Sequence, residues 1–111
     1  MTTTITVSNE IINHLESLSW GEKDDINKKL RTLIIAEYQR RLARYRLTDR
    51  QMTQKYKMNF ASFEQQQTTR QQGYTWEVES DAMSWETAID GIRTMEQQLA
   101  KLTGQELPHE H

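Results

Sequence analysis

The chain has 111 residues, a formal net charge of −2 and no cysteine, and 35% of its residues are hydrophobic. This length fits one domain or a small domain with an appendage. The missing cysteines exclude disulfides and cysteine-ligated zinc sites, no apolar run approaches the ~20 residues of a membrane span, and no basic-then-apolar leader opens the chain. The absence of cysteines is compatible with a reducing cytoplasm, where we expect the protein. With a mean hydropathy of −0.88, one copy buries only a thin core, so we expect a partner, either a second copy or another protein.

The first element predicted along the chain is a short β-strand over residues 3–7. Threonines alternate there with aliphatic side chains, so that Ile5 and Val7 share one face and Thr4 and Thr6 the other. No second strand is expected before residue 74, which leaves the backbone groups of the first strand without partners. We therefore predict that it pairs with the same strand of a second chain, and that the protein is a homodimer.

Two helices are predicted to follow this strand. Ser8 suits the N-cap of a helix over about 9–19, and Gly21 suits the left-handed residue that comes after a helix. The next helix is predicted to begin near residues 22–25. It either ends near Leu47, before a capping-box pattern at 48–51, or runs on with a bend. The apolar positions of these elements form the predicted dimer core: Ile5, Val7, Ile11, Leu15, Leu18, Ile26, Leu30, Leu33 and Ile34.

Three further elements are predicted in the second half of the chain. Asn59 suits the cap of a helix from Phe60 to about residue 71, and the polar run at 65–72 is typical of a linker. A second short strand is predicted at 74–79, because Tyr74, Trp76 and Val78 alternate with polar residues. A final helix over about 81–102 is predicted to be capped by Ser80 or Asp81.

The order of strand, helix, glycine turn and longer helix over residues 2–46 resembles the ribbon–helix–helix family of repressors. The resemblance implies a mainly α fold, with an N-terminal ribbon–helix–helix dimer that has one short strand per chain and a helical C-terminal extension. In this family the ribbon enters the major groove of operator DNA and its outward side chains read bases. Carried over by position, the base-reading residues are Thr2, Thr4 and Thr6, and Lys23 is the cation near the phosphate-binding start of the second helix. The alternative is a ribbon that only pairs two chains.

The second half of the chain is more acidic than the first. Residues 1–46 carry eight Lys and Arg against six Asp and Glu, whereas residues 47–111 carry six against ten. Between Gly73 and Asp90 there are five acidic residues and no Lys or Arg, interleaved with aromatic side chains and Met83. Exposed aromatics flanked by carboxylates suit a basic protein surface. The alternative is that Trp76 and Trp85 pack onto the second helix as core.

A DNA-binding head followed by an acidic tail is similar to the antitoxins of type II toxin–antitoxin systems. The resemblance implies a head at 1–46 that represses its own operon, a connector at 47–72, and a tail at 73–111 that neutralises a cognate toxin, expected to be a basic RNase. The predicted toxin-binding residues are Tyr74, Trp76, Glu77, Glu79, Asp81, Met83, Trp85, Glu86, Ile89 and Ile92.

No pattern in the sequence predicts catalysis. There is no glycine-rich phosphate loop and no nucleophile beside a base, so we expect no enzyme activity, no cofactor and no metal, with His109 and His111 incidental. The arginine run at 40–46 could contact nucleic acid, but as a helix end it is interpreted as a solvated face or a site for the acidic tail. Two alternatives to the antitoxin stay open: a stand-alone ribbon–helix–helix regulator, and a helical adaptor or scaffold that does not bind DNA.

Overall fold

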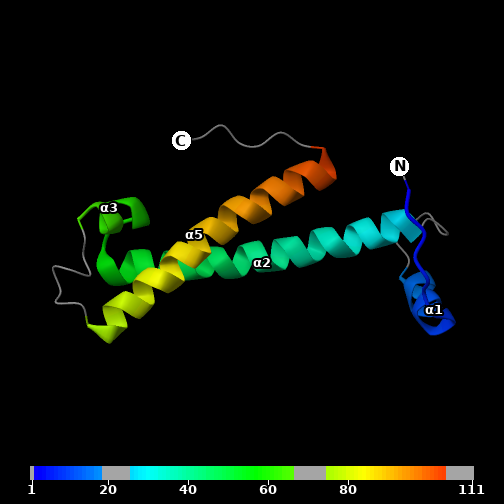
Figure 1. Ribbon diagram of the computed structural model, residues 1–111, viewed down its shortest axis with the longest axis horizontal. Helices are drawn as coiled ribbons and strands as arrows, with labels where there is room; N and C mark the ends of the chain where they lie inside the picture. Colours follow the sequence, from blue (N-terminus) through cyan, green and yellow to red (C-terminus); the bar gives the residue numbers. More distant parts are fainter. Residues whose placement is uncertain (1, 19–25, 67–74, 105–111) are drawn as a thin grey trace. The chain divides into compact units, whose positions relative to one another are not determined.

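The computed structural model describes residues 2–18, 26–66 and 75–104. Within these ranges the chain forms helices and no strand (Figure 1). The helices are α1 (Asn9–Ser17), α2 (Ile26–Tyr56), α3 (Phe60–Gln65) and α5 (Trp76–Thr103). The chain divides into two compact units, residues 1–36 and 37–111, with the boundary inside α2.

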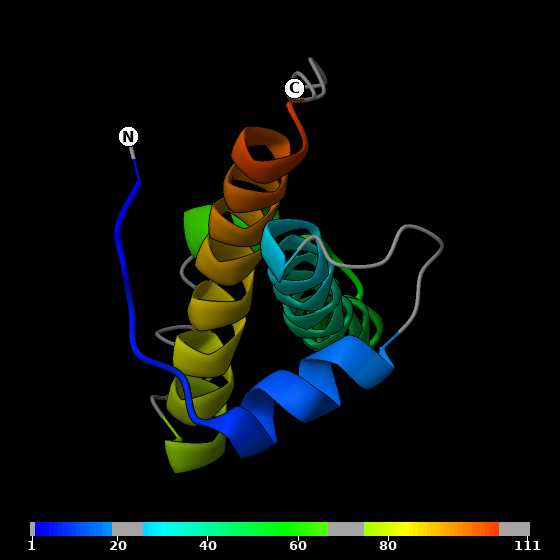
Figure 2. The same cartoon turned by 90° about the vertical axis from the view of Figure 1, so that its right-hand side faces the viewer.

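The first unit begins with an extended segment that leads into α1 (Figure 2). Ser8 caps this helix, because its hydroxyl accepts a hydrogen bond from the backbone N–H of Ile11 at 3.2 Å. The cap predicted from the sequence is therefore confirmed, and the helix ends at Ser17, close to the predicted end. The predicted turn at Gly21 and the predicted helix start at 22–25 lie outside the described residues.

The ribbon–helix–helix fold class is wrong, because the described residues contain no strand. Residues 2–7 are extended but make no ladder of backbone hydrogen bonds. The other predicted strand, which was expected over 74–79, is helical from Trp76 onward. A short period-two pattern is equally compatible with an extended segment that pairs with no other strand, and residues 2–7 form such a segment in the single chain.

Helix α2 does not end near Leu47, which was one of the two possibilities that the sequence left open. The helix passes residues 46–51 without interruption and ends at Tyr56. The capping-box pattern does not start a helix there. The Thr48 hydroxyl donates to the carbonyl of Arg44 at 3.4 Å, and the Asp49 carboxylate accepts a hydrogen bond from Trp85. The domain boundaries at 46/47 and 72/73 stay predictions.

The second unit contains a helical hairpin. Helix α5 runs antiparallel to the part of α2 after residue 36, as Figure 1 shows. Cross-helix contacts show the same direction, since Arg46 pairs with Glu96 at 2.9 Å and Lys55 with Asp81 at 2.6 Å. Asn59 caps α3 as predicted, accepting from the N–H of Ser62 at 2.8 Å. Helix α3 is described over six residues, and the predicted continuation beyond residue 66 lies outside the described part of the chain.

The core of the second unit lies where α3 meets the hairpin. It is built from Phe63, Val78 and Trp85, all buried. Partly buried side chains surround these three: Met52, Tyr56, Met58, Phe60, Ala82 and Ile89. The core therefore joins the end of α2, α3 and the first half of α5, and it fixes how α5 presents its outer side.

Candidate protein-binding face on α5

Helix α5 starts earlier than the sequence predicts, and its cap explains why. The Thr75 hydroxyl accepts from the N–H of Val78 at 3.2 Å, and Glu77 and Glu79 lie in the first turn, where carboxylates stabilise the positive end of the helix dipole. The expected strand at 74–79 is thus wrong for its described residues. Trp76 and Val78 do not share an environment, as strand neighbours of period two would, because Val78 is buried and Trp76 is 81% exposed.

The inner side of α5 is aromatic core. Trp85 is fully buried, and its ring centroid lies 5.0 Å from Phe63, 5.4 Å from Phe60 and 6.0 Å from Tyr56. Its indole Nε1–H donates to Oδ1 of Asp49 at 2.9 Å, so its one polar atom is satisfied. For Trp85, the alternative that the tryptophan packs as core is the one the structure shows.

Hydrogen bonds between charged and polar side chains hold the start of α5 against the end of α2. Lys55 donates to Glu77 at 2.5 Å and to Asp81 at 2.6 Å, and Tyr56 Oη donates to the same Asp81 oxygen at 2.7 Å. Burial opposes ionisation of Asp81, but these hydrogen bonds outweigh it and lower the pKa of that carboxyl; the same contacts raise the pKa of Lys55. Two predicted toxin-binding acids, Glu77 and Asp81, are therefore engaged inside the chain.

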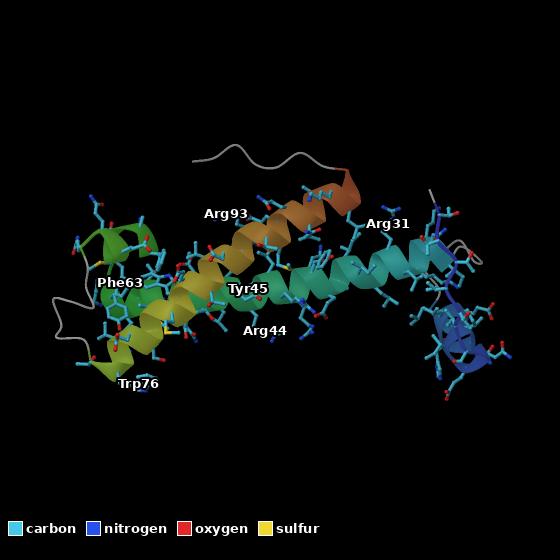
Figure 3. The ribbon with its side chains drawn as sticks, viewed as in Figure 1. Arg31, Arg44, Tyr45, Phe63, Trp76 and Arg93 are labelled. Atoms are coloured by element: carbon cyan, nitrogen blue, oxygen red, sulfur yellow. The ribbon has the colours of Figure 1, made fainter. Side chains whose placement is uncertain are left out.

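The outer side of α5 carries the exposed members of the predicted set. Trp76 is 81% and Met83 68% exposed, and Glu79 and Glu86 are exposed beside them without an ion-pair partner among the described residues. The spacing of these positions places them along one side of a helix. Figure 3 shows Trp76 at the start of α5, outside the core that holds Phe63. We call Trp76, Glu79, Met83 and Glu86 the acidic-aromatic face.

The remaining predicted toxin-binding residues are divided. Ile89 and Ile92 are half-buried, and Ile89 packs against the aromatic core. Tyr74 lies outside the described residues. The predicted set therefore mixes residues that hold the hairpin together with residues that it exposes.

A groove beside the face was not found from the sequence. It has a volume of about 520 Å³ and lies in the second unit. Four carboxylates, one guanidinium, two apolar side chains and two small side chains line it: Asp49, Glu64, Glu86, Asp90, Arg93, Phe60, Ile89, Asn59 and Ala61. Glu86 belongs to both the groove and the face. The sequence signal that was available is the surplus of acidic residues after Gly73, but Asp49 and Glu64 come from α2 and α3, on which no toxin-binding residue was predicted.

The residues predicted to bind DNA are not gathered into a site. Thr2, Thr4 and Thr6 are exposed along the extended segment, and Lys23 lies outside the described residues. Of the predicted dimer core, Leu15 is buried, whereas Ile5, Ile11, Leu18, Leu33 and Ile34 are exposed in the single chain. Val7, Ile26 and Leu30 are partly buried.

In the part of the chain that the structure describes, no group of His, Asp and Glu side chains has the arrangement of a metal site. Among the same residues, no helix combines the length and the apolar character that crossing a membrane requires.

Comparisons with protein-family models, with curated proteins and with solved structures found no match to this chain.

Proposed function

We propose that this protein is the antitoxin of a type II toxin–antitoxin pair and that its acidic-aromatic face binds a basic toxin. The observation that carries the proposal is Trp76, a large aromatic side chain that is 81% exposed in the first turn of helix α5. Tryptophan is enriched among the residues that dominate binding energy at protein interfaces. An isolated exposed apolar residue is ordinary, but here Met83 lies two turns further along the same side of α5.

The charge around these two side chains specifies the partner. Glu79 and Glu86 flank them, and the adjoining groove adds Asp49, Glu64 and Asp90 with a single Arg93. A surface of this kind attracts cations and repels acidic proteins. An RNase fits it, because a groove that binds RNA phosphates is itself basic. Occupying such a groove with helix α5 would exclude the RNA substrate.

The test is inhibition of the toxin candidate encoded beside the gene of this chain. Replacing Trp76 and Met83 by alanine removes both apolar anchors, and we expect the affinity for the toxin to fall at least ~30-fold, which corresponds to about 2 kcal/mol. The matched control is Thr94→Ala with Gln97→Ala, two exposed positions further along α5 that lie outside the face. Titration calorimetry and an RNA-cleavage assay supply the two measurements.

Three outcomes separate the alternatives. Loss of binding and inhibition in the face variant, but not in the control, supports the antitoxin. Tight binding that leaves RNA cleavage unchanged would favour the helical adaptor. No binding of the neighbouring gene product, or equal effects of both variants, would contradict the proposal. Repression through a ribbon, and with it a stand-alone ribbon–helix–helix regulator, is not part of the proposal, because both need the strand that is missing from residues 2–7.

We also propose that a second copy of the chain covers the apolar side chains of the first unit. Residues 2–18 and 26–36 bury one hydrophobic side chain, Leu15, and expose Ile11 and Leu33. Units below about 40 residues need a disulfide, a metal or oligomerisation to be stable, and the chain has no cysteine. Sedimentation should show a dimer that Ile11→Ser with Leu33→Ser dissociates, whereas Leu47→Ser, at an exposed position in the second unit, should leave it intact. A monomer in the unmodified chain would contradict this.

A further inference from the structure

The strongest positive charge of the second unit lies on α2 and is not used by the proposed toxin-binding face. Residues 37–56 contain six Lys and Arg and two acidic residues. Two of the basic residues face α5, since Arg46 pairs with Glu96, and Lys55 with Glu77 and Asp81. One of the acids, Asp49, accepts from Trp85. What is left is Arg50 and a cluster of three arginines around a single carboxylate.

That cluster consists of Arg40, Arg41 and Arg44 with Glu37, and we call the three arginines the arginine face. Their spacing along α2 places them on one side of the helix, where with Tyr45 they line a hollow of about 280 Å³. The sequence interpretation took this run for a helix end. Because α2 continues to Tyr56, the arginines instead lie in the middle of a helix, with a backbone that is fully hydrogen-bonded.

Glu37 organises two of the three guanidinium groups. Arg40 donates to it from Nε at 3.0 Å and from Nη2 at 2.7 Å, and Arg41 donates from Nε at 2.7 Å. These hydrogen bonds lower the pKa of the Glu37 carboxyl, which stays ionised at neutral pH. One carboxylate thus holds two guanidinium planes in place, and the group keeps a net positive charge.

The guanidinium edges that do not touch Glu37 remain available. Arginine has five N–H donors in a planar fork, and Arg41 gives only its Nε–H to Glu37. The Arg44 side chain is exposed and makes no hydrogen bond or ion pair among the described residues. In Figure 3 it extends from α2, and Tyr45 lies between α2 and α5. The Tyr45 ring packs on Gly91, where an added Cβ would be 2.5 Å away, so contact with α5 holds this wall of the hollow in place.

We infer that the arginine face binds the phosphodiester backbone of a nucleic acid. Arginine forks match the oxygens of phosphate and form strong charge-assisted hydrogen bonds with them. Three arginines in two helical turns match a ligand that repeats its negative charge along a chain. A basic toxin would be repelled from this side of α2, so the two surfaces can be occupied by different partners. The inference goes beyond the proposed antitoxin activity and does not depend on it.

The experiment is fluorescence anisotropy with two labelled probes of mixed sequence, a DNA duplex of about 30 base pairs and a single-stranded RNA of about the same length, over ~50 to ~200 mM salt. The variant is Arg40→Gln with Arg41→Gln and Arg44→Gln. The matched control is Arg50→Gln with Arg93→Gln and Lys101→Gln, which removes the same charge from exposed positions outside the arginine face. We expect the variant to weaken binding at least ~10-fold. The slope of log affinity against log salt concentration should fall by about two to three, roughly one unit for each arginine. The control should change the affinity less than ~3-fold.

Binding of either probe with this difference supports the inference, and the preferred probe identifies the source of the phosphodiester. Equal weakening by both triple variants would overturn it, because only net charge would then matter. Absence of binding at the lowest salt concentration would overturn it as well. So would a result in which polyglutamate displaces the labelled probe as well as unlabelled nucleic acid does. If the triple variant loses its helical circular dichroism signal, the single variant Arg44→Gln takes its place in the binding experiment. This change leaves the Glu37 cluster intact, and we expect it to weaken binding ~3- to 10-fold.

Discussion

Two tryptophans nine residues apart on α5 have opposite roles, and the difference follows from the cap. With Thr75 as the N-cap, Trp76 is the first helical residue and lies outside the core, whereas Trp85 lies between α2 and α3 and is fully buried. Composition alone treats them alike, because both are aromatic and both stand in an acidic stretch. Their separation into core and surface depends on where the helix begins.

Phenylalanine substitutions should distinguish the two tryptophans. Trp85→Phe removes buried area and the donor to Asp49, so we expect the free energy of unfolding to fall by about 1–3 kcal/mol. Trp76→Phe, at an exposed position, should change it by less than about 0.5 kcal/mol. Urea unfolding followed by circular dichroism measures both. Equal destabilisation by the two changes would contradict the assignment of Trp85 to the core.

Tyr56 should make the stability of the hairpin fall at alkaline pH. Burial, and after it the hydrogen bond to Asp81, raises the pKa of Tyr56 from 10.0 to about 12. The folded state therefore holds this proton more tightly than the unfolded chain. Its contribution is complete below pH 10 and is lost as the pH rises towards 12.

Thermal unfolding measured at a series of pH values checks this prediction. Tyr56→Phe should flatten the fall between pH 10 and 12, even though it lowers stability at neutral pH by removing a hydrogen bond, about 1 kcal/mol. Lys55 also has a raised pKa, so it adds its own fall in stability at alkaline pH to both proteins, and the difference between the two profiles reports Tyr56. Parallel profiles would show that Tyr56 is not the titrating group.

At the scale of the elements, the helix caps could be predicted where the signal is local. Ser8 and Asn59 each stand directly before their helix, and both caps are confirmed by hydrogen bonds. The cap at Thr75 was missed, because Tyr74, Trp76 and Val78 imitate strand alternation and two later polar residues also suit a cap. The burial of Val78 in the cluster with Phe63 favours the helix over the strand, and a local pattern could not show it because Phe63 is distant in sequence.

The close approach of α2 and α5 at Gly91 gives a test of the hairpin. A Cβ at this position would lie 2.5 Å from the Tyr45 ring, so Gly91→Ala should force the ring to shift at a cost of about 1–3 kcal/mol. Alanine also favours helix over glycine by about 1 kcal/mol. We therefore expect a net loss in the unmodified chain and a gain in a Tyr45→Ala background, where only the helix preference acts.

Thermal unfolding of the four proteins measures this reversal of sign. A stabilising Gly91→Ala change in the unmodified chain would show that Tyr45 does not press on Gly91. A destabilising change in both backgrounds would place the obstacle elsewhere on α2.

At the scale of the whole molecule, the two units differ in how they are held together. The second has an aromatic core, a buried Met95 and Leu42, and several cross-helix polar contacts, whereas the described residues of the first bury only Leu15 among hydrophobics. The composition predicted a thin core for a single chain, and the need for a protein partner stays a prediction. It could not show which apolar residues a single chain buries, because periodicity places side chains on one face without naming what covers that face.

Hydrogen exchange should therefore separate the units. Amides of α5 near Trp85 should open with a free energy close to that of global unfolding. In dilute solution, amides of α1 should have an opening free energy of only about 1–2 kcal/mol. Protection of α1 should rise with protein concentration, because a second copy is proposed to cover Ile11. Protection of α5 should stay constant, since its contacts lie within one chain. If α1 were as protected as α5 in the most dilute sample, the first unit would be stable alone, and self-association would not be needed to explain its apolar surface.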